Sequence, residues 1–118
     1  MKAQIVATIG PATGNNKIIE EIIKTGMDIA RLNFSWGTYA EHHAYVQMIR
    51  AVAGKLKKKV LIIQDLSGPR ISKNDGHCFD DVNKYILTKK DLLDLDFAKE
   101  HEIDYVAQSF VGSAEDVL

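Results

Sequence analysis

The sequence predicts an α/β domain built on a parallel sheet. Four short apolar segments of strand type alternate with segments whose apolar residues recur at helical spacing. The chain has 118 residues, the length of one domain. Because successive strand–helix units in one sheet connect in the right-handed sense, the helices should lie outside the sheet. We therefore expect a single domain over residues 1–118 with parallel (βα)4 organisation.

The first unit is a strand over residues 4–9 followed by a helix over residues 17–24. The strand is rich in β-branched residues and ends at Gly10-Pro11, a pair typical of turns. The helix carries four isoleucines at helical spacing, and Gly26 predicts its end. This segment has the order of strand, turn and helix that a βα unit requires.

The second unit is a strand over residues 28–32 and a longer helix that begins after a polar loop at residues 33–37. Thr38 and Glu41 have the spacing of a capping box, in which each side chain accepts a hydrogen bond from the backbone of the other residue. Apolar residues then mark one face of the helix. They are Val46, Ile49, Val52, Ala53 and Leu56.

The third and fourth units follow with a longer connection between them. Residues 60–63 are continuously apolar, as in a parallel strand that is buried on both faces. Residues 71–86 show no periodicity and contain many turn-forming residues, so we predict a short irregular loop. Thr88 can cap a helix that extends to about residue 101, and residues 105–110 read as the fourth strand.

Composition argues against two kinds of partner. The formal net charge is -1, with 15 basic and 16 acidic residues, so the chain lacks the positive field that nucleic acid demands. No apolar run approaches the roughly 20 residues that span a bilayer, and we expect a cytoplasmic protein without membrane contact. The single cysteine, Cys78, is interpreted as an ordinary loop thiol.

Polar residues gather where the second and third strands end. Arg31, Asn33 and Ser35 follow one strand, and Asp65 follows the other. The carboxyl ends of parallel strands meet at the edge where α/β proteins bind ligands. A guanidinium suits an anion, and amide, hydroxyl and carboxylate oxygens suit a small cation. A second interpretation stays open, in which Arg31 pairs with a carboxylate and the other residues shape a turn.

Five segments, in order, resemble pyruvate kinases. Residues 5–13 (IVATIGPAT) resemble the opening strand of that family, and residues 26–35 (GMDIARLNFS) resemble its second strand. Residues 65–71, 87–92 and 104–111 resemble the third strand-end loop and the helix and strand after it. The resemblance implies the N-terminal half of the catalytic TIM barrel. The family usually inserts a small β-domain lid after the third strand, and the short loop predicted there implies that the lid is missing.

The resemblance also implies roles for individual residues. Arg31 is expected to act in catalysis by contacting the phosphate of phosphoenolpyruvate or the transferring phosphoryl group. Asn33, Ser35 and Asp65 match the side-chain ligands of a monovalent cation, usually potassium, and Leu66 matches a ligand that uses its backbone oxygen. The implied small-molecule partners are phosphoenolpyruvate or pyruvate and ADP or ATP.

Two residues depart from the family pattern. Trp36 shares the implied substrate- and nucleotide-binding segment with Arg31, Asn33 and Ser35, but it stands where the family has a His beside the nucleotide phosphates. Trp offers stacking and one N–H donor without a positive charge. Ser72 stands where the family usually places an Arg that helps to hold ATP. Both changes weaken the expectation that nucleotide binds.

The resemblance leaves the activity of this chain uncertain. The catalytic Lys and the Glu and Asp ligands of magnesium come from later strand ends of the family's barrel, so no divalent-metal ligands are expected here. Phosphoryl transfer without them should be nearly absent. An isolated half-barrel also exposes two sheet edges, so we expect a homo-oligomer or a complementary half-barrel as partner. The alternatives are a non-enzymatic phosphate- or nucleotide-binding module and an oligomeric scaffold.

The remaining aromatic and histidine residues are interpreted as structural. We predict that three tyrosines pack locally: Tyr39, Tyr45 and Tyr85. Four histidines lack the spacing of a metal site, and the first two of them are predicted to be exposed on a helix. They are His42, His43, His77 and His101.

Overall fold

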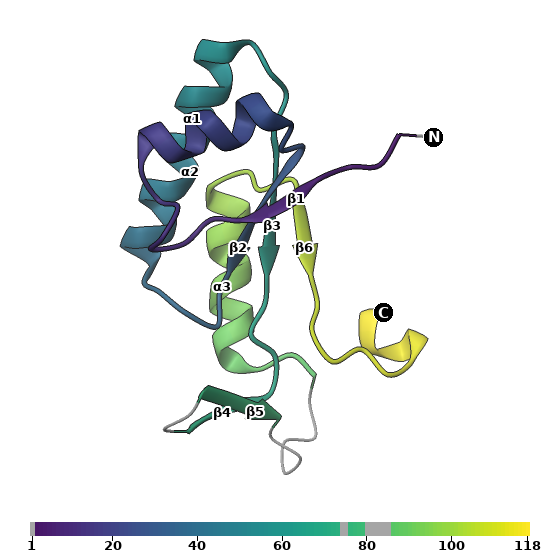
Figure 1. Cartoon of the computed structure of the whole chain (residues 1–118). Helices are drawn as coiled ribbons and strands as arrows, with labels where there is room; N and C mark the ends of the chain where they lie inside the picture. The colour runs from purple at the N-terminus through teal and green to yellow at the C-terminus, as the bar shows by residue number, and fades with distance from the viewer. Residues whose placement is uncertain (1, 74–75, 80–85) are drawn as a thin grey trace.

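In a computed structural model, one four-stranded parallel sheet carries three helices on one of its faces (Figure 1). The structure describes residues 2–73, 76–79 and 86–118, and the side chains of 71–79 are outside that description. The α/β class and the parallel order of a partial barrel are confirmed. The strands, in their order across the sheet, are β1 (Val6–Thr8), β2 (Ile29–Asn33), β3 (Leu61–Asp65) and β6 (Tyr105–Ala107).

The helices begin and end at the predicted signals. The Thr38–Glu41 capping box is present, and a second one joins Thr88 to Asp91. Gly26 ends the first helix in the left-handed region at φ 116°, where a side chain would be strained. The helices are α1 (Asn16–Thr25), α2 (Tyr39–Leu56) and α3 (Lys89–Glu100), and a short 3-10 helix, η1 (Ala114–Val117), follows β6.

The core lies between the sheet and the helices. β2 and β3 alternate between buried and half-buried residues, so only one face of each strand is covered. The prediction that the third strand is buried on both faces is wrong, because all three long helices pack on the same side. The strand also extends to Asp65, since Gln64 is fully buried and donates to the Asp94 carbonyl over 2.6 Å.

The connection between β3 and α3 contains regular structure that the sequence did not indicate. β4 (Arg70–Lys73) and β5 (Gly76–Phe79) pair as an antiparallel hairpin. The predicted absence of regular structure is therefore wrong for these residues, because backbone pairing in a short hairpin needs no apolar periodicity. The expectations for four side chains lie outside the described residues: Ser72, His77, Cys78 and Tyr85.

Both edges of the described sheet are open. β1 forms one edge and β6 the other, and neither has a second strand neighbour. Apolar side chains are exposed on each, with Val6 at 53% and Tyr105 at 52% of full exposure. Open, apolar strand edges favour pairing with another strand. Among the described residues, no helix is both long and apolar enough to cross a membrane.

Candidate functional site

Arg31 and Asp65 form an ion pair at the carboxyl edge of the sheet. Arg31 Nε and Nη2 donate to the same carboxylate oxygen, Asp65 Oδ2, over 2.9 and 2.5 Å. Arg31 Nη1 donates to Thr8 Oγ1 at the end of β1 over 3.0 Å. The pair is mostly buried, with side-chain exposures of 32% and 19%. Arg31 thus pairs with a carboxylate, as the second interpretation of the sequence expected. These contacts use three of its five N–H donors, so two remain for an anion.

The loop after β2 carries two of the predicted site residues, Asn33 and Ser35. Asn33 Oδ1 accepts the backbone N–H of Ser35 over 3.0 Å, which forms a tight turn. Phe34 N–H donates to the Asp65 carbonyl over 2.9 Å, so the loop is fixed to β3. Ser35 Oγ is buried and has no hydrogen-bond partner in the part of the chain that the structure describes. A buried hydroxyl without a partner is costly unless a ligand satisfies it.

Ser109, which follows β6, binds the chain segment that carries two of the predicted cation ligands, Asp65 and Leu66. Its hydroxyl donates to the Leu66 carbonyl over 2.7 Å and lies 3.2 Å from Asp65 Oδ1. Sequence reasoning did not include Ser109 or Thr8 among the site residues. Each comes at or just after the end of a strand, and that position was the signal that could have identified them.

The residues predicted to bind a monovalent cation lie at this edge. Asn33, Ser35 and Asp65 bring an amide, a hydroxyl and a carboxylate to neighbouring strand ends, and Leu66 adds a backbone carbonyl. Hard oxygen donors of this mixture suit cations such as potassium, and the buried Ser35 hydroxyl has no other partner among the described residues. In the described part of the chain, no three His, Cys, Asp or Glu residues group as a metal site.

Comparison with known families matches residues 1–83 of the 118 to "Pyruvate kinase, barrel domain". The chain belongs to the pyruvate kinase family. The pyruvate kinase of Thermococcus litoralis is 40% identical over 95 residues, which are 77% of this chain and 20% of that protein. Those of Staphylococcus haemolyticus and Staphylococcus saprophyticus are 46% and 50% identical over 63% and 59% of the chain. The matches span 13% and 12% of those two proteins, so the chain represents a small part of its relatives.

A cavity of about 280 Å³ lies beside the strand-end site, between the loops after β1 and β2. Trp36 lines it and is 58% exposed. Asn33 also lines the cavity, whereas Arg31, Ser35 and Asp65 do not. Of the four residues predicted to bind substrate or nucleotide, the structure thus places Trp36 and Asn33 at the cavity and the other two outside its lining.

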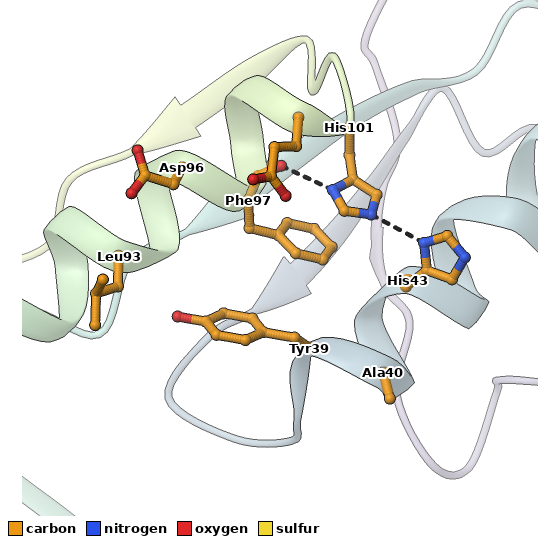
Figure 2. Close-up of a pocket in the computed structure, with 8 residues that line it drawn as sticks. Tyr39, Ala40, His43, Leu93, Asp96, Phe97 and His101 are labelled. Carbon is orange, nitrogen blue, oxygen red and sulfur yellow. Dashed lines mark hydrogen bonds between the residues drawn. The ribbon is translucent and has the colours of Figure 1, made fainter.

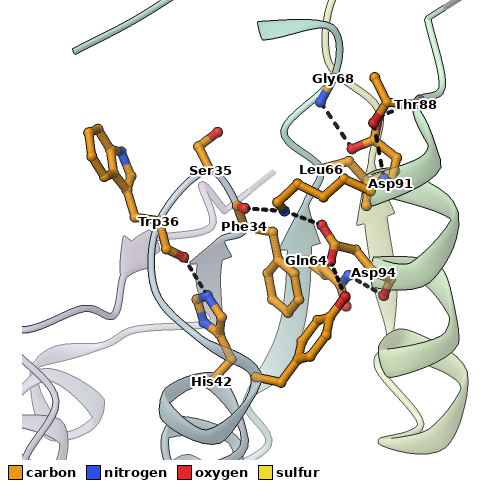
Figure 3. A network of polar contacts seen from close by, with 12 residues as sticks. Phe34, Ser35, Trp36, His42, Gln64, Leu66, Gly68, Thr88, Asp91 and Asp94 are labelled. Atoms are coloured by element: carbon orange, nitrogen blue, oxygen red, sulfur yellow. Dashed lines mark hydrogen bonds and ion pairs between the residues drawn. The ribbon is translucent and has the colours of Figure 1, made fainter. Parts of the chain in front are cut away.

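His42 is buried, and the prediction that it is exposed is wrong. It is 5% exposed, stacks on Phe34 with ring centroids 4.1 Å apart, and lies on the same helix face as Val46 and Ile49. Its Nε2 donates to the Trp36 carbonyl over 2.8 Å (Figure 3). The spacing of His42 from those core residues was the sequence signal that was missed. Burial lowers the pKa of His42, which favours the neutral ring.

Acidification is expected to destabilise the protein through His42. Because the pKa is lowered only in the folded state, the unfolded chain takes up the proton first as the pH falls below about 6.5. The free energy of unfolding should decrease between about pH 7 and pH 5.5. Urea denaturation at several pH values measures this slope. His42→Gln keeps a donor for the Trp36 carbonyl and should make the free energy of unfolding less dependent on pH. An unchanged pH dependence would contradict the assignment of this effect to His42.

A buried polar network joins the start of α2 to α3 (Figure 3). Asp94 is 1% exposed, and its two carboxylate oxygens accept from Tyr39 over 2.7 Å and from Lys90 over 2.5 Å. Burial and the Asp94 carboxylate raise the pKa of Tyr39 to about 12. The Tyr39 ring also stacks on Phe97, with centroids 5.8 Å apart, which confirms the prediction that it packs locally.

Tyr39→Phe should lower the free energy of unfolding by about 1–3 kcal/mol, because a buried Asp94 oxygen loses its donor. Tyr45→Phe is the matched control, since no hydrogen bond among the described residues involves its hydroxyl, and it should change stability by less than about 0.5 kcal/mol. Urea denaturation of both variants measures the difference. The Tyr39 phenol should titrate near pH 12 by absorbance, and its contribution to stability should disappear as the pH rises above about 10. Equal stability of the two variants would contradict the network.

A separate groove of about 440 Å³ lies between α2 and α3, away from the strand ends (Figure 2). His43 Nδ1 and His101 Nε2 are 2.9 Å apart there, and His101 Nδ1 donates to the Phe97 carbonyl over 2.9 Å. The two histidines thus connect the helices by a hydrogen bond.

Proposed function

We propose that this chain supplies the phosphate- and potassium-binding part of a pyruvate kinase active site. The observation that supports it best is the Arg31–Asp65 pair, with the turn from Asn33 to Ser35 at the same carboxyl edge of a parallel sheet. This edge is where barrel enzymes of this architecture bind ligands. The substrates would be phosphoenolpyruvate and ADP, with pyruvate and ATP as products.

In this proposal Arg31 binds the phosphate group and orients it. Asp65 holds the guanidinium through two N–H groups, and Thr8 through a third, so its plane is set before ligand binds. The remaining donors then stabilise the equatorial oxygens of the phosphoryl group. Asn33, Ser35, Asp65 and the Leu66 carbonyl hold potassium, which when bound adds positive charge near that group.

We also propose that the 118-residue chain has almost no turnover by itself. The catalytic lysine and magnesium ligands of the family would come from a complementary half-barrel, in the same polypeptide or in a partner. Without the divalent metal, charge on the transferring phosphoryl group is poorly neutralised, and the rate should fall by many orders of magnitude. We place this chemistry in the cytoplasm, where glycolytic phosphoryl transfer takes place.

Calorimetric titration with phosphoenolpyruvate tests the binding function directly. The chain should bind in potassium chloride and more weakly in tetramethylammonium chloride at the same ionic strength, and Arg31→Ala should bind more weakly in both. A coupled assay for pyruvate, with ADP and magnesium, should show no turnover. Activity that disappears in Arg31→Ala would overturn the proposed inactivity, and absence of binding by a folded wild-type chain would overturn the function.

A second function, nucleotide binding without transfer, is favoured by Trp36 at the cavity next to Asn33. An exposed indole can stack on a base, although it cannot neutralise a phosphate as a cationic histidine can. Trp36 is the only tryptophan, so its fluorescence reports on this cavity alone. ADP should quench that fluorescence saturably if the site binds nucleotide. A Trp36→Phe variant, which lacks the signal, controls for absorption by the nucleotide.

The open edges support an oligomer as the third element of the proposal. A twofold axis along the strand direction would place β6 of one copy beside β1 of the other, with all strands parallel and both Arg31–Asp65 pairs at the same end. Val6 and Tyr105 would then be covered. Light scattering should give twice the mass of the 13.2 kDa chain. A monodisperse monomer that unfolds cooperatively would reject this assembly.

A further inference from the structure

Two neighbouring residues in the first turn of α3 each bind a different loop of the strand-end site. Lys90 Nζ donates to the carbonyl of Phe34 over 2.7 Å, in the loop after β2. Asp91 Oδ1 accepts the N–H of Gly68 over 3.1 Å, in the loop after β3 (Figure 3). The Lys90 ammonium thus binds a backbone carbonyl, and the Asp91 carboxylate binds a backbone N–H. The same helical turn sets the position of both loops.

The Lys90 contact falls between two of the proposed potassium ligands. Phe34 separates Asn33 from Ser35, and its N–H already donates to the Asp65 carbonyl. With Lys90 on its C=O, the backbone of Phe34 is bound on both sides. The direction of this C=O determines the rotation of the peptide unit that leads into Ser35. Lys90 therefore influences where the unpartnered Ser35 hydroxyl lies.

The Lys90 ammonium is itself fixed. It forms an ion pair with Asp94 over 2.5 Å and lies 6.0 Å from the centre of the Phe34 ring. Asp94 is held in turn by Tyr39, so the ammonium keeps its place although the lysine side chain is 54% exposed. Because Asp94 neutralises its charge, Lys90 acts on the site through its hydrogen bond to Phe34 more than through a long-range field.

We propose that Lys90 is a positioning residue, which holds the Asn33–Ser35 turn in the conformation that binds potassium and phosphate. This inference rests on the proposed function of the site. Without Lys90 the Phe34 carbonyl loses its charged donor, and the peptide rotates to satisfy it elsewhere. The oxygens that bind the cation are then no longer held in position beforehand. Because they must be ordered when the cation binds, the affinity for the cation decreases.

Three variants of the whole chain test this role. Lys90→Met removes the donor but keeps an unbranched stem of similar length. Lys89→Met removes the same charge from the adjacent exposed position of the helix, which has no hydrogen bond or ion pair to the site loops among the described residues. Lys90→Arg keeps donors for both partners and should restore function. Amide hydrogen exchange at Ser35, followed by NMR, reports the order of the turn without any ligand. Calorimetry with phosphoenolpyruvate in potassium chloride reports binding.

The expected results separate the two proposals. In Lys90→Met, Ser35 should exchange about tenfold faster and phosphoenolpyruvate should bind about tenfold more weakly, while Lys89→Met and Lys90→Arg stay near wild type. Wild-type exchange and affinity in Lys90→Met would overturn the role of Lys90 and leave the site intact. If the wild type fails to bind, the proposed function fails, and the exchange rates alone decide whether Lys90 orders the turn.

Discussion

Phe34→Ala is expected to remove most of the stability of the chain at 25 °C. Phe34 is 3% exposed, stacks on His42 and meets Phe97 edge to face with centroids 5.1 Å apart. Removing a buried aromatic ring costs about 3–5 kcal/mol, because the cavity left behind closes only in part. A domain of this size has a total stability of about 5–15 kcal/mol, and one that lacks cover on one sheet face should be near the lower value.

Urea denaturation, followed by circular dichroism, measures this loss. Phe110→Ala is the matched control, because Phe110 is 40% exposed and lies 5.0 Å from the Arg70 guanidinium. Its loss should cost about 1 kcal/mol. Equal stability of the two variants would contradict the role of Phe34 in packing the site loop against the core.

Asp65→Asn is expected to weaken phosphoenolpyruvate binding about a hundredfold and to abolish its dependence on potassium. The carboxylate contributes the one full negative charge among the proposed potassium ligands, and it also orients Arg31 through two hydrogen bonds. The amide keeps an oxygen but offers no charge to either partner. The variant therefore loses the cation and misplaces the anion-binding group at the same time.

Calorimetry in potassium chloride and in tetramethylammonium chloride measures both effects. Asp28→Asn provides the control, since Asp28 lies before the opposite end of β2 and accepts from the backbone of Ile5 over 2.8 Å. It should bind like the wild type. Potassium dependence that survives in Asp65→Asn would show that the cation is held by other groups.

Local signals in the sequence predicted most of the fold. Thr38 and Thr88 cap helices, and Gly26 ends one, because each depends on residues three or four positions away. The hairpin between β3 and α3 was not predicted, since its pairing leaves no apolar pattern. The extension of β3 was missed because Gln64 is polar, and only the contact with Asp94 explains how it is buried.

The candidate site was predictable to a smaller degree. Arg31 and Asp65 could be placed together because the carboxyl ends of neighbouring parallel strands meet at one edge. The contacts of Lys90 and Asp91 depend on how α3 packs against loops that are 23 to 56 residues distant in sequence. No periodicity or motif encodes such contacts. They follow from the three-dimensional arrangement alone.

The hydrogen bond from Gly68 to Asp91 has a consequence for how this part of the chain can change in evolution. It joins the two ends of the β3–α3 connection, and Thr88 caps the helix at the same point. Segments whose ends are fixed close together tolerate insertions and deletions, because the entropy of closing a loop grows only slowly with its length. The hairpin can therefore be lengthened, replaced or exchanged for a whole domain without moving Arg31 or Asp65. Sequence changes in the hairpin can therefore be selected independently of sequence changes in the site.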